Sequence, residues 1–213
     1  MTSLLDPSRI RRLLCLGAHC DDIEIGAAGT IGRLLEANPA VEVRWVVFAT
    51  SNPARCAEAR RAAQLVLGET RAATLFLPFR DAFFQHEGVA LKEAFERIKA
   101  DFPDPDLILT HHDDDRHQDH RAVSQLTWNT WRNHTILEYE IFKYDGDLSR
   151  PNVFVPLTQQ QVDRKLSVLF EAFVSQAGKH WFTPDVFTGL MRLRGVECGA
   201  THAEAFHARK LCW

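Results

Sequence analysis

The sequence lacks the features that direct a protein into a membrane, into secretion or onto a nucleic acid. No apolar run reaches the roughly 18–20 residues that a membrane-spanning helix needs. Residues 1–7 lack the basic and then apolar profile of a signal peptide. The net charge is -3, so no basic excess attracts nucleic acid or an anionic membrane surface. These absences predict a cytoplasmic protein with no nucleic-acid partner and no membrane span.

The sequence has few cysteines, and their spacing does not suggest pairs. The chain has 5 cysteines in 213 residues, none of them in a CxxC pair, which predicts free thiols. Cys15 alternates within an apolar run and is expected in the core. Cys20 lies inside a group of His and Asp residues, where a thiolate ligand is an open alternative, although the neighbouring imidazole and carboxylates suit a metal better.

Internal repeats, low-complexity tracts and long linkers are also missing, which predicts a single domain over residues 1–213. β-rich apolar runs alternate with amphipathic runs, and Gly68 is expected to cap the second long helix. The pattern predicts an α/β fold, a single Rossmann-like three-layer domain with a mostly parallel sheet and right-handed crossovers. The expected strands cover residues 13–17, 43–49, 74–77, 107–110, 135–143, 153–155 and 204–210. The expected helices cover residues 31–35, 54–67, 91–100, 158–173 and 184–193.

The two densest groups of His and Asp each follow an expected strand. The first reads Ala18-His19-Cys20-Asp21-Asp22, and the second runs from His111 to His120. Because the carboxyl ends of parallel strands lie on one edge of a sheet, the two groups can meet in one pocket. The first turn lacks G-x-G-x-x-G, which argues against a dinucleotide site.

The first group has the residue types of a metal site. His19 and Asp22 offer nitrogen and oxygen ligands suited to Zn²⁺, with Fe²⁺ or Ni²⁺ as alternatives. Asp21 lies beside them and can act as a general base on water. The alternative is that the Asp residues only cap a helix and that His19 is structural.

The second group can complete the site. His120 supplies a third ligand, so that the set becomes two imidazoles and one carboxylate. Asp119 is expected to hydrogen-bond to His117 and to raise its pKa, which would make an imidazolium that stabilises an oxyanion or protonates a leaving amine. The remaining residues of the group are expected in a mostly solvated polar loop, with one of them capping the helix: His111, His112, Asp113, Asp114 and Asp115.

At these residues the chain resembles the LmbE/PIG-L family of metal-dependent N-deacetylases, whose motifs are A-H-P-D-D-E and H-x-D-H. The first motif reads here with Cys20 in place of Pro and Ile23 in place of Glu. The second spans residues 117–120. The resemblance implies that His19, Asp22 and His120 bind the metal, usually zinc. It implies that Asp21 is the base and that His117 and Asp119 assist the oxyanion and the leaving group.

The resemblance extends to two expected substrate contacts. Arg55 precedes an Ala-rich helix and Asp81 follows the third strand, where the family holds its substrate. The alternatives are an exposed helix-start cation for Arg55 and a turn residue for Asp81. Together these features predict a zinc-dependent hydrolase that removes the N-acetyl group from a small-molecule or glycan substrate of the N-acetylglucosamine type. A non-catalytic sugar- or nucleotide-binding module and a metallohydrolase of another amide or ester are the alternatives, and a homo-oligomer is left open.

Overall fold

The alternation of strands and helices produces one mostly parallel sheet. The computed structural model describes residues 6–68 and 72–211, and within them the strand order is β3-β2-β1-β4-β5-β7-β6. The strands are β1 (Arg12–Gly17), β2 (Glu42–Val47), β3 (Ala72–Phe76), β4 (Leu107–His111), β5 (Ile136–Tyr139), β6 (Val153–Leu157) and β7 (His202–His207). The α-helices are α1 (Asp22–Ala37), α2 (Pro53–Leu67), α3 (Gly88–Asp101), α4 (Gln118–Thr130), α5 (Gln159–Ala172) and α6 (Pro184–Cys198). Short 3-10 turns are η1 (Pro7–Arg9), η2 (Phe84–His86) and η3 (Val174–Gln176).

The order of the strands creates a switch point between β1 and β4. Strands β1 to β5 pair in parallel, whereas β7 is antiparallel to both β5 and β6. From β1 the chain moves outward through β2 to β3 and then returns to place β4 on the other side of β1. In such sheets ligands bind beyond the carboxyl ends of the strands at the switch point. Both His/Asp groups follow these two strands, so the topology brings them together.

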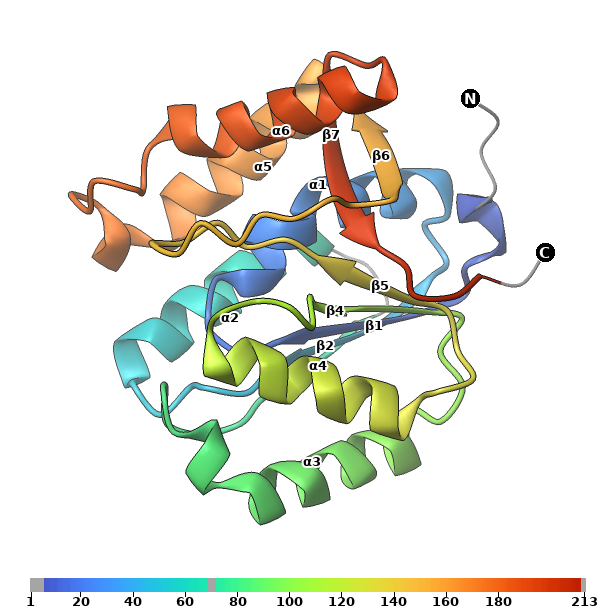
Figure 1. Ribbon diagram of the computed structural model, residues 1–213, viewed down its shortest axis with the longest axis vertical. Coiled ribbons are helices and arrows are strands. Elements are labelled where there is room, and N and C mark those ends of the chain that lie inside the picture. The colour runs from blue at the N-terminus through green and yellow to red at the C-terminus, as the bar shows by residue number, and fades with distance from the viewer. Residues whose placement is uncertain (1–5, 69–71, 212–213) are drawn as a thin grey trace.

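Helices cover both faces of the sheet, as Figure 1 shows with α1 and α2 on one side and α3 and α4 on the other. Alternate residues of β1 supply the two cores, because successive side chains in a strand point to opposite faces. Leu13 and Cys15 pack with α1, α2 and α5. Leu14 and Leu16 pack with α3 and α4. The predicted α/β fold with a mostly parallel sheet and the predicted core position of Cys15 are therefore confirmed.

Glycine lets α1 approach the sheet closely. A Cβ atom at Gly26 would lie 2.3 Å from Cδ2 of Tyr139, and one at Gly29 would lie 2.5 Å from Cδ1 of Leu157. Real Cβ atoms do not reach such distances, so a larger residue at either position would push the helix outward. This contact matters because the amino end of α1 carries Asp21 and Asp22.

Several element boundaries differ from the predictions, and the first helix, α1, begins at Asp22 instead of residue 31. Strand β5 ends at Tyr139 instead of residue 143, because Glu140 pairs with Arg194 and the chain then leaves the sheet. Strand β7 lies at His202–His207 instead of residues 204–210. Helix α6 continues to Cys198, where Gly199 caps it with a φ of 75°, a left-handed conformation that favours glycine.

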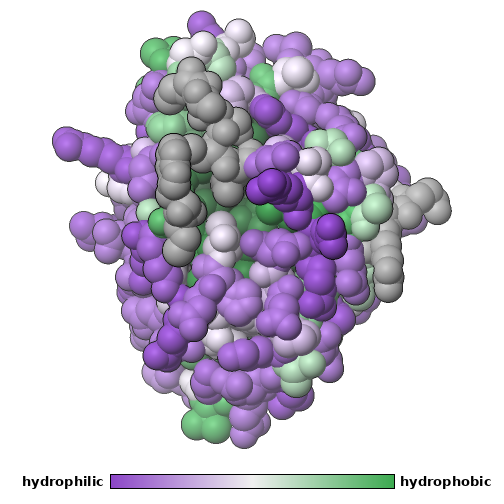
Figure 2. Space-filling model, turned by 90° about the vertical axis from the view of Figure 1, so that its right-hand side faces the viewer, coloured by the Kyte–Doolittle hydropathy of each residue, from purple (hydrophilic) through white to green (hydrophobic). Residues whose placement is uncertain are grey.

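The parallel strands β1 to β5 begin at the edge of the sheet that lies opposite the two His/Asp groups. The surface at this edge shows mostly hydrophilic side chains (Figure 2). Among the described residues, no helix combines the length and apolar character needed to cross a membrane.

Candidate metal and catalytic site

The three predicted ligands lie together where β1 and β4 end. The Nδ1 atom of His19 is 3.1 Å from Nε2 of His120 and 3.3 Å from Oδ2 of Asp22. The Nε2 atom of His120 is 3.5 Å from Oδ1 of Asp22. Four ligands arranged tetrahedrally at 2.0–2.1 Å from Zn²⁺ are about 3.3 Å apart. The donor set and its spacing therefore fit a divalent metal.

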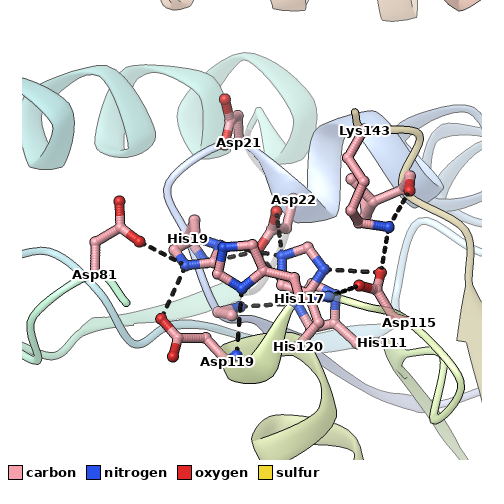
Figure 3. Close-up of polar contacts among 12 residues, drawn as sticks. His19, Asp21, Asp22, Asp81, His111, Asp115, His117, Asp119, His120 and Lys143 are labelled. Carbon is pink, nitrogen blue, oxygen red and sulfur yellow. Dashed lines mark hydrogen bonds and ion pairs between the residues drawn. The ribbon is translucent and has the colours of Figure 1, made fainter. Parts of the chain in front are cut away.

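Each of the two imidazoles has a carboxylate behind it. The Nε2 atom of His19 faces Oδ2 of Asp119 at 3.2 Å, and Nδ1 of His120 faces Oδ2 of Asp115 at 2.9 Å (Figure 3). Metal-binding histidines adopt this arrangement, because the outer carboxylate fixes the tautomer and orients the ring. The arrangement points Nδ1 of His19 and Nε2 of His120 toward Asp22.

The electrostatics favour an ionised carboxylate at the centre. Burial alone would raise the pKa of Asp22, but His120, His111 and His19 outweigh burial and hold that pKa well below its usual range. Asp22 also accepts a hydrogen bond at Oδ2 from the backbone N–H of His19, at 2.6 Å. The carboxylate is thus available as an anionic ligand at neutral pH.

Among the described residues, three other donor groups overlap with this set. The ligand atoms of His19, His117 and His120 lie close enough to share an ion, and so do those of Asp22, His111 and His120. A third group combines His19 with Asp81 and Asp119. Each of these groups contains His19 or His120, and the group with His117 contains both.

Asp21 stands at the N-cap of α1 without making a capping hydrogen bond. Its Oδ2 atom instead pairs with Nη2 of Arg55 at 2.8 Å, and its side chain points away from the imidazoles in Figure 3. Burial raises the pKa of Asp21, and Arg55 opposes that rise. A simple helix cap therefore does not explain this residue, whereas a buried carboxyl with a raised pKa suits proton transfer.

The expected pairing of Asp119 with His117 is wrong. The fully buried carboxylate of Asp119 accepts hydrogen bonds from the backbone N–H groups of Ala82 at 2.7 Å and Phe84 at 3.2 Å, in addition to facing His19. The backbone N–H of Asp119, rather than its carboxylate, donates to Nδ1 of His117 at 3.2 Å. The carboxylate of Asp119 binds the backbone of the turn at Ala82, which the sequence did not predict.

The same contacts change the expected charge of His117. Its pKa is lowered by burial and by the nearby imidazoles of His19 and His120. Because Nδ1 accepts a hydrogen bond, the ring of a neutral His117 carries its proton on Nε2. His117 is therefore a neutral hydrogen-bond donor and not the predicted imidazolium.

The two expected substrate contacts lie at the site. Arg55 pairs with both Asp21 and Glu58, and its Nη1 atom lies 2.7 Å from Oε2 of Glu58. Arg55 is therefore not a free exposed cation. The Oδ1 atom of Asp81 lies 3.1 Å from Nε2 of His19. The loop that carries Asp81 contains Ala82 at a φ of 67°, a strained left-handed conformation held by the hydrogen bond to Asp119.

Cys20 does not join the donor groups. Its Sγ atom donates to the carbonyl of Ala49 at 3.4 Å, and burial raises the pKa of the thiol to about 12. Cys20 is therefore not a ligand in any of these groups, and the imidazole and carboxylate ligands that the sequence favoured over a thiolate remain.

The expectation of a mostly solvated loop before His117 is wrong for His111 and Asp115, whereas Asp114 is exposed. His111 is fully buried, faces Oδ2 of Asp22 at 3.1 Å and accepts a hydrogen bond from the backbone N–H of Ala18. Asp115 is buried against His120, and Lys143 pairs with Asp115 at 2.9 Å. The position of His111 at the end of an all-buried strand was a usable signal. No local pattern links Lys143 to the site, because only the path of the chain after β5 brings it there.

Comparisons with known proteins identify the family of the chain and proteins that are similar to it. Residues 14–131 match the sequence profile of the PIG-L family, described as GlcNAc-PI de-N-acetylase. The chain belongs to the PIG-L family. The uncharacterized deacetylase YaiS of Escherichia coli (strain K12) is 34% identical over 151 residues, which cover 65% of this chain and 79% of YaiS.

Solved structures show the same fold at low sequence identity. N,N'-diacetylchitobiose deacetylase from Pyrococcus horikoshii superposes with a TM-score of 0.71 at 19% identity, over 97% of this chain and 86% of that one. The zinc-inhibited form of teicoplanin deacetylase Orf2 superposes with a TM-score of 0.73 at 14% identity, over 92% of this chain and 97% of that one.

Proposed function

We propose that this chain is a metal-dependent hydrolase that removes the N-acetyl group from an N-acetylated amino sugar or glycoside. The observation that carries the proposal is the convergence of His19, Asp22 and His120 within 3.5 Å of one another, with a carboxylate behind each imidazole. Membership of the PIG-L family supports the choice of an N-acetyl amide as the bond that is broken.

The metal is proposed to be Zn²⁺, with Fe²⁺ and Ni²⁺ as alternatives that the same nitrogen and oxygen ligands accept. When bound, it would polarise the acetyl carbonyl and lower the pKa of a water molecule to roughly 7. His19, Asp22 and His120 would hold it, while Asp119 and Asp115 keep the two imidazoles in the binding tautomer.

The proposed proton transfers use Asp21 and His117. Asp21 takes a proton from the attacking water and gives it to the nitrogen of the leaving amine, which its raised pKa favours. The carbonyl carbon gains a bond to oxygen and loses its bond to nitrogen, so the products are acetate and a free amine. His117 donates from Nε2 to the carbonyl oxygen as negative charge develops there.

Arg55 and Asp81 are proposed to contact the sugar. Both already contact site residues, Arg55 through Asp21 and Asp81 through His19. Each presents charged groups that can hydrogen-bond to hydroxyl groups of a pyranose ring. A single functional domain over residues 1–213 and a cytoplasmic location remain predictions of the sequence.

The experiment that tests the proposal measures acetate and amine together. Protein loaded separately with Zn²⁺, Fe²⁺ or Ni²⁺ is incubated with N-acetylglucosamine, its methyl glycoside and N,N'-diacetylchitobiose, beside p-nitrophenyl acetate and an N-acetyl amino acid. We expect equimolar acetate and amine from at least one amino sugar. Hydrolysis of only the ester or the amino acid would redirect the proposal to another metallohydrolase, and binding without release of acetate would favour a binding module.

A further inference from the structure

A serine, a histidine and a glutamate are joined by hydrogen bonds outside the proposed metal site. The Oγ atom of Ser149 lies 3.3 Å from Nε2 of His112, and Nδ1 of His112 lies 2.7 Å from Oε2 of Glu138. The imidazole thus contacts the hydroxyl through one ring nitrogen and the carboxylate through the other. A nucleophile, its general base and the group that orients the base are arranged in this order. We call these three residues the serine triad.

The serine triad is separate from the metal ligands, although His112 follows His111 in the sequence. His111 faces Asp22, whereas His112 faces Glu138. Successive side chains of an extended segment point to opposite sides, which directs the two imidazoles to different neighbours. Among the described residues, no member of the serine triad belongs to a donor group that could hold a metal.

Glu138 is held in place as an ionised carboxylate. It is fully buried and accepts hydrogen bonds from Nε1 of Trp128 at 2.5 Å, Nε of Arg209 at 2.7 Å and the backbone N–H of Asp113 at 3.2 Å. Burial alone would raise the pKa of Glu138, but its hydrogen bonds to His112 and Trp128 and the charge of Arg209 outweigh burial and lower that pKa. An ionised carboxylate only accepts hydrogen bonds, so Nδ1 of His112 carries a proton.

This tautomer sets the direction of the hydrogen bond from Ser149. When His112 is neutral and carries its proton on Nδ1, Nε2 can only accept. The hydroxyl of Ser149 therefore donates to His112, which is the contact through which a base removes the proton of a nucleophile.

A second imidazole holds the oxygen of Ser149 from the other side. The Nε2 atom of His207 lies 3.1 Å from Oγ of Ser149, and its ring stacks on that of His112 at 3.8 Å. Because the hydroxyl donates its proton to His112, Oγ is free to accept a hydrogen bond from Nε2 of His207. The two contacts fix the rotamer of the hydroxyl.

A small pocket opens beside this hydroxyl. Ser149, His112, Leu148 and Ile141 are among the residues that line it. Ser149 is partly exposed, and Leu148 is 42% exposed. Apolar side chains next to a nucleophile suit the hydrocarbon part of an acyl group. The pocket thus gives an acyl donor access to Oγ.

We propose that Ser149 is a nucleophile that takes the acyl group of a carboxylic ester, with His112 as its general base and Glu138 as the residue that positions His112. The Oγ atom forms a bond to the carbonyl carbon while its proton moves to Nε2 of His112. The bond between the carbonyl carbon and the alcohol oxygen then breaks, and the departing oxygen takes the proton from His112. The products are an acylated Ser149 and a free alcohol. This activity goes beyond the proposed deacetylation and requires no metal.

The test uses protein kept free of metal by a chelator, so that the metal site does not contribute. The protein is treated with an alkyl fluorophosphonate, which reacts with an activated serine by the same proton transfer and releases fluoride. Peptide mass spectrometry identifies the labelled residue. We expect the label at Ser149 in the wild type. His112→Gln keeps a polar side chain but removes the base, so labelling should slow by about 10²–10⁴-fold.

Two variants of serine complete the test. Ser149→Ala should lose the label, whereas the matched control Ser167→Ala, at an exposed position of α5, should be labelled at the wild-type rate. Circular dichroism checks that the variants are folded. Absence of the label from Ser149 in the folded wild type, or an unchanged rate in folded His112→Gln, would overturn the serine triad.

A second measurement tests the choice of an ester. Metal-free wild-type protein should release p-nitrophenol from p-nitrophenyl acetate in a burst of about one molecule per chain, the kinetic sign of an acylated enzyme. Peptide mass spectrometry should find the acetyl group on Ser149, and Ser149→Ala should show no burst. A labelled Ser149 that gives no burst would contradict the ester as the acyl donor.

Discussion

The Nη2 atom of Arg55 lies 2.8 Å from Oδ2 of Asp21, in a site where burial pushes the pKa of that carboxyl upward. Arg55 opposes the effect of burial and is itself held by Glu58. The protonation of the proposed base thus depends on a residue from α2, thirty-four positions away in sequence.

Removal of this cation should shift the acidic limb of the pH profile. A carboxylate acts as a base only when it is deprotonated, so activity falls as the pH drops through its pKa. Arg55→Met removes the charge that lowers the pKa of Asp21, and the acidic limb of kcat/KM should move to higher pH. Arg61→Met, on the same helix but paired at the surface with Glu171, is the control. An unmoved limb in Arg55→Met would mean that the limb reports another group.

Asp21→Asn separates the base from the ligands. The amide cannot accept the proton from water, so the rate should fall by about 10²–10⁴-fold. Metal content should stay at the wild-type value, because Asp22, and not Asp21, faces the imidazoles. Asp101→Asn, at the exposed end of α3, controls for the loss of one charge. Loss of metal from Asp21→Asn would make Asp21 a ligand.

The carboxylates behind the imidazoles should act on metal affinity. Asp115→Asn and Asp119→Asn each leave the ligand atoms in place but alter the partner of a ligand ring. Such changes typically weaken metal binding about 10–100-fold. Competition with a chelator measures the dissociation constant, and Asp113→Asn serves as the control. Equal affinities in all the variants would show that these carboxylates do not orient the ligands.

Stability should fall in mild acid because of His207. Burial, with the neighbouring His112 next in importance, lowers the pKa of His207 from 6.5 to about 4. Between these values the unfolded chain binds a proton that the folded chain does not, so folding weakens as the pH falls from 6.5 toward 4. His207→Gln removes this titration, and its free energy of unfolding should drop less between pH 7.5 and 5.

Urea unfolding in the presence of a chelator measures this difference without a contribution from metal binding. The exposed His86→Gln serves as the control, and it should lose as much stability as the wild type. An identical loss in His207→Gln and in the wild type would assign the acid sensitivity to other groups.

Much of the site could be predicted because the sequence places both His/Asp groups at the ends of parallel strands. The pairing of β1 with β4 then makes residues 101 positions apart, His19 and His120, approach within 3.1 Å. The partner of Asp119 could not be predicted, because it depends on a strained turn at Ala82. The sequence analysis placed Lys143 in a strand. The sequence does not show that Glu140 pairs with Arg194 or that β5 ends at Tyr139.

The most direct test of the account is acetate release by metal-free protein as a divalent metal is added. Separate samples receive Zn²⁺, Fe²⁺ or Ni²⁺ in steps, with an N-acetylated glycoside as the substrate. The ligand set of His19, Asp22 and His120 predicts almost no release before addition. It also predicts a rate that rises until one metal is bound per chain and then levels off, with at least one of the three metals. The same rate before and after the addition of every metal would contradict the account.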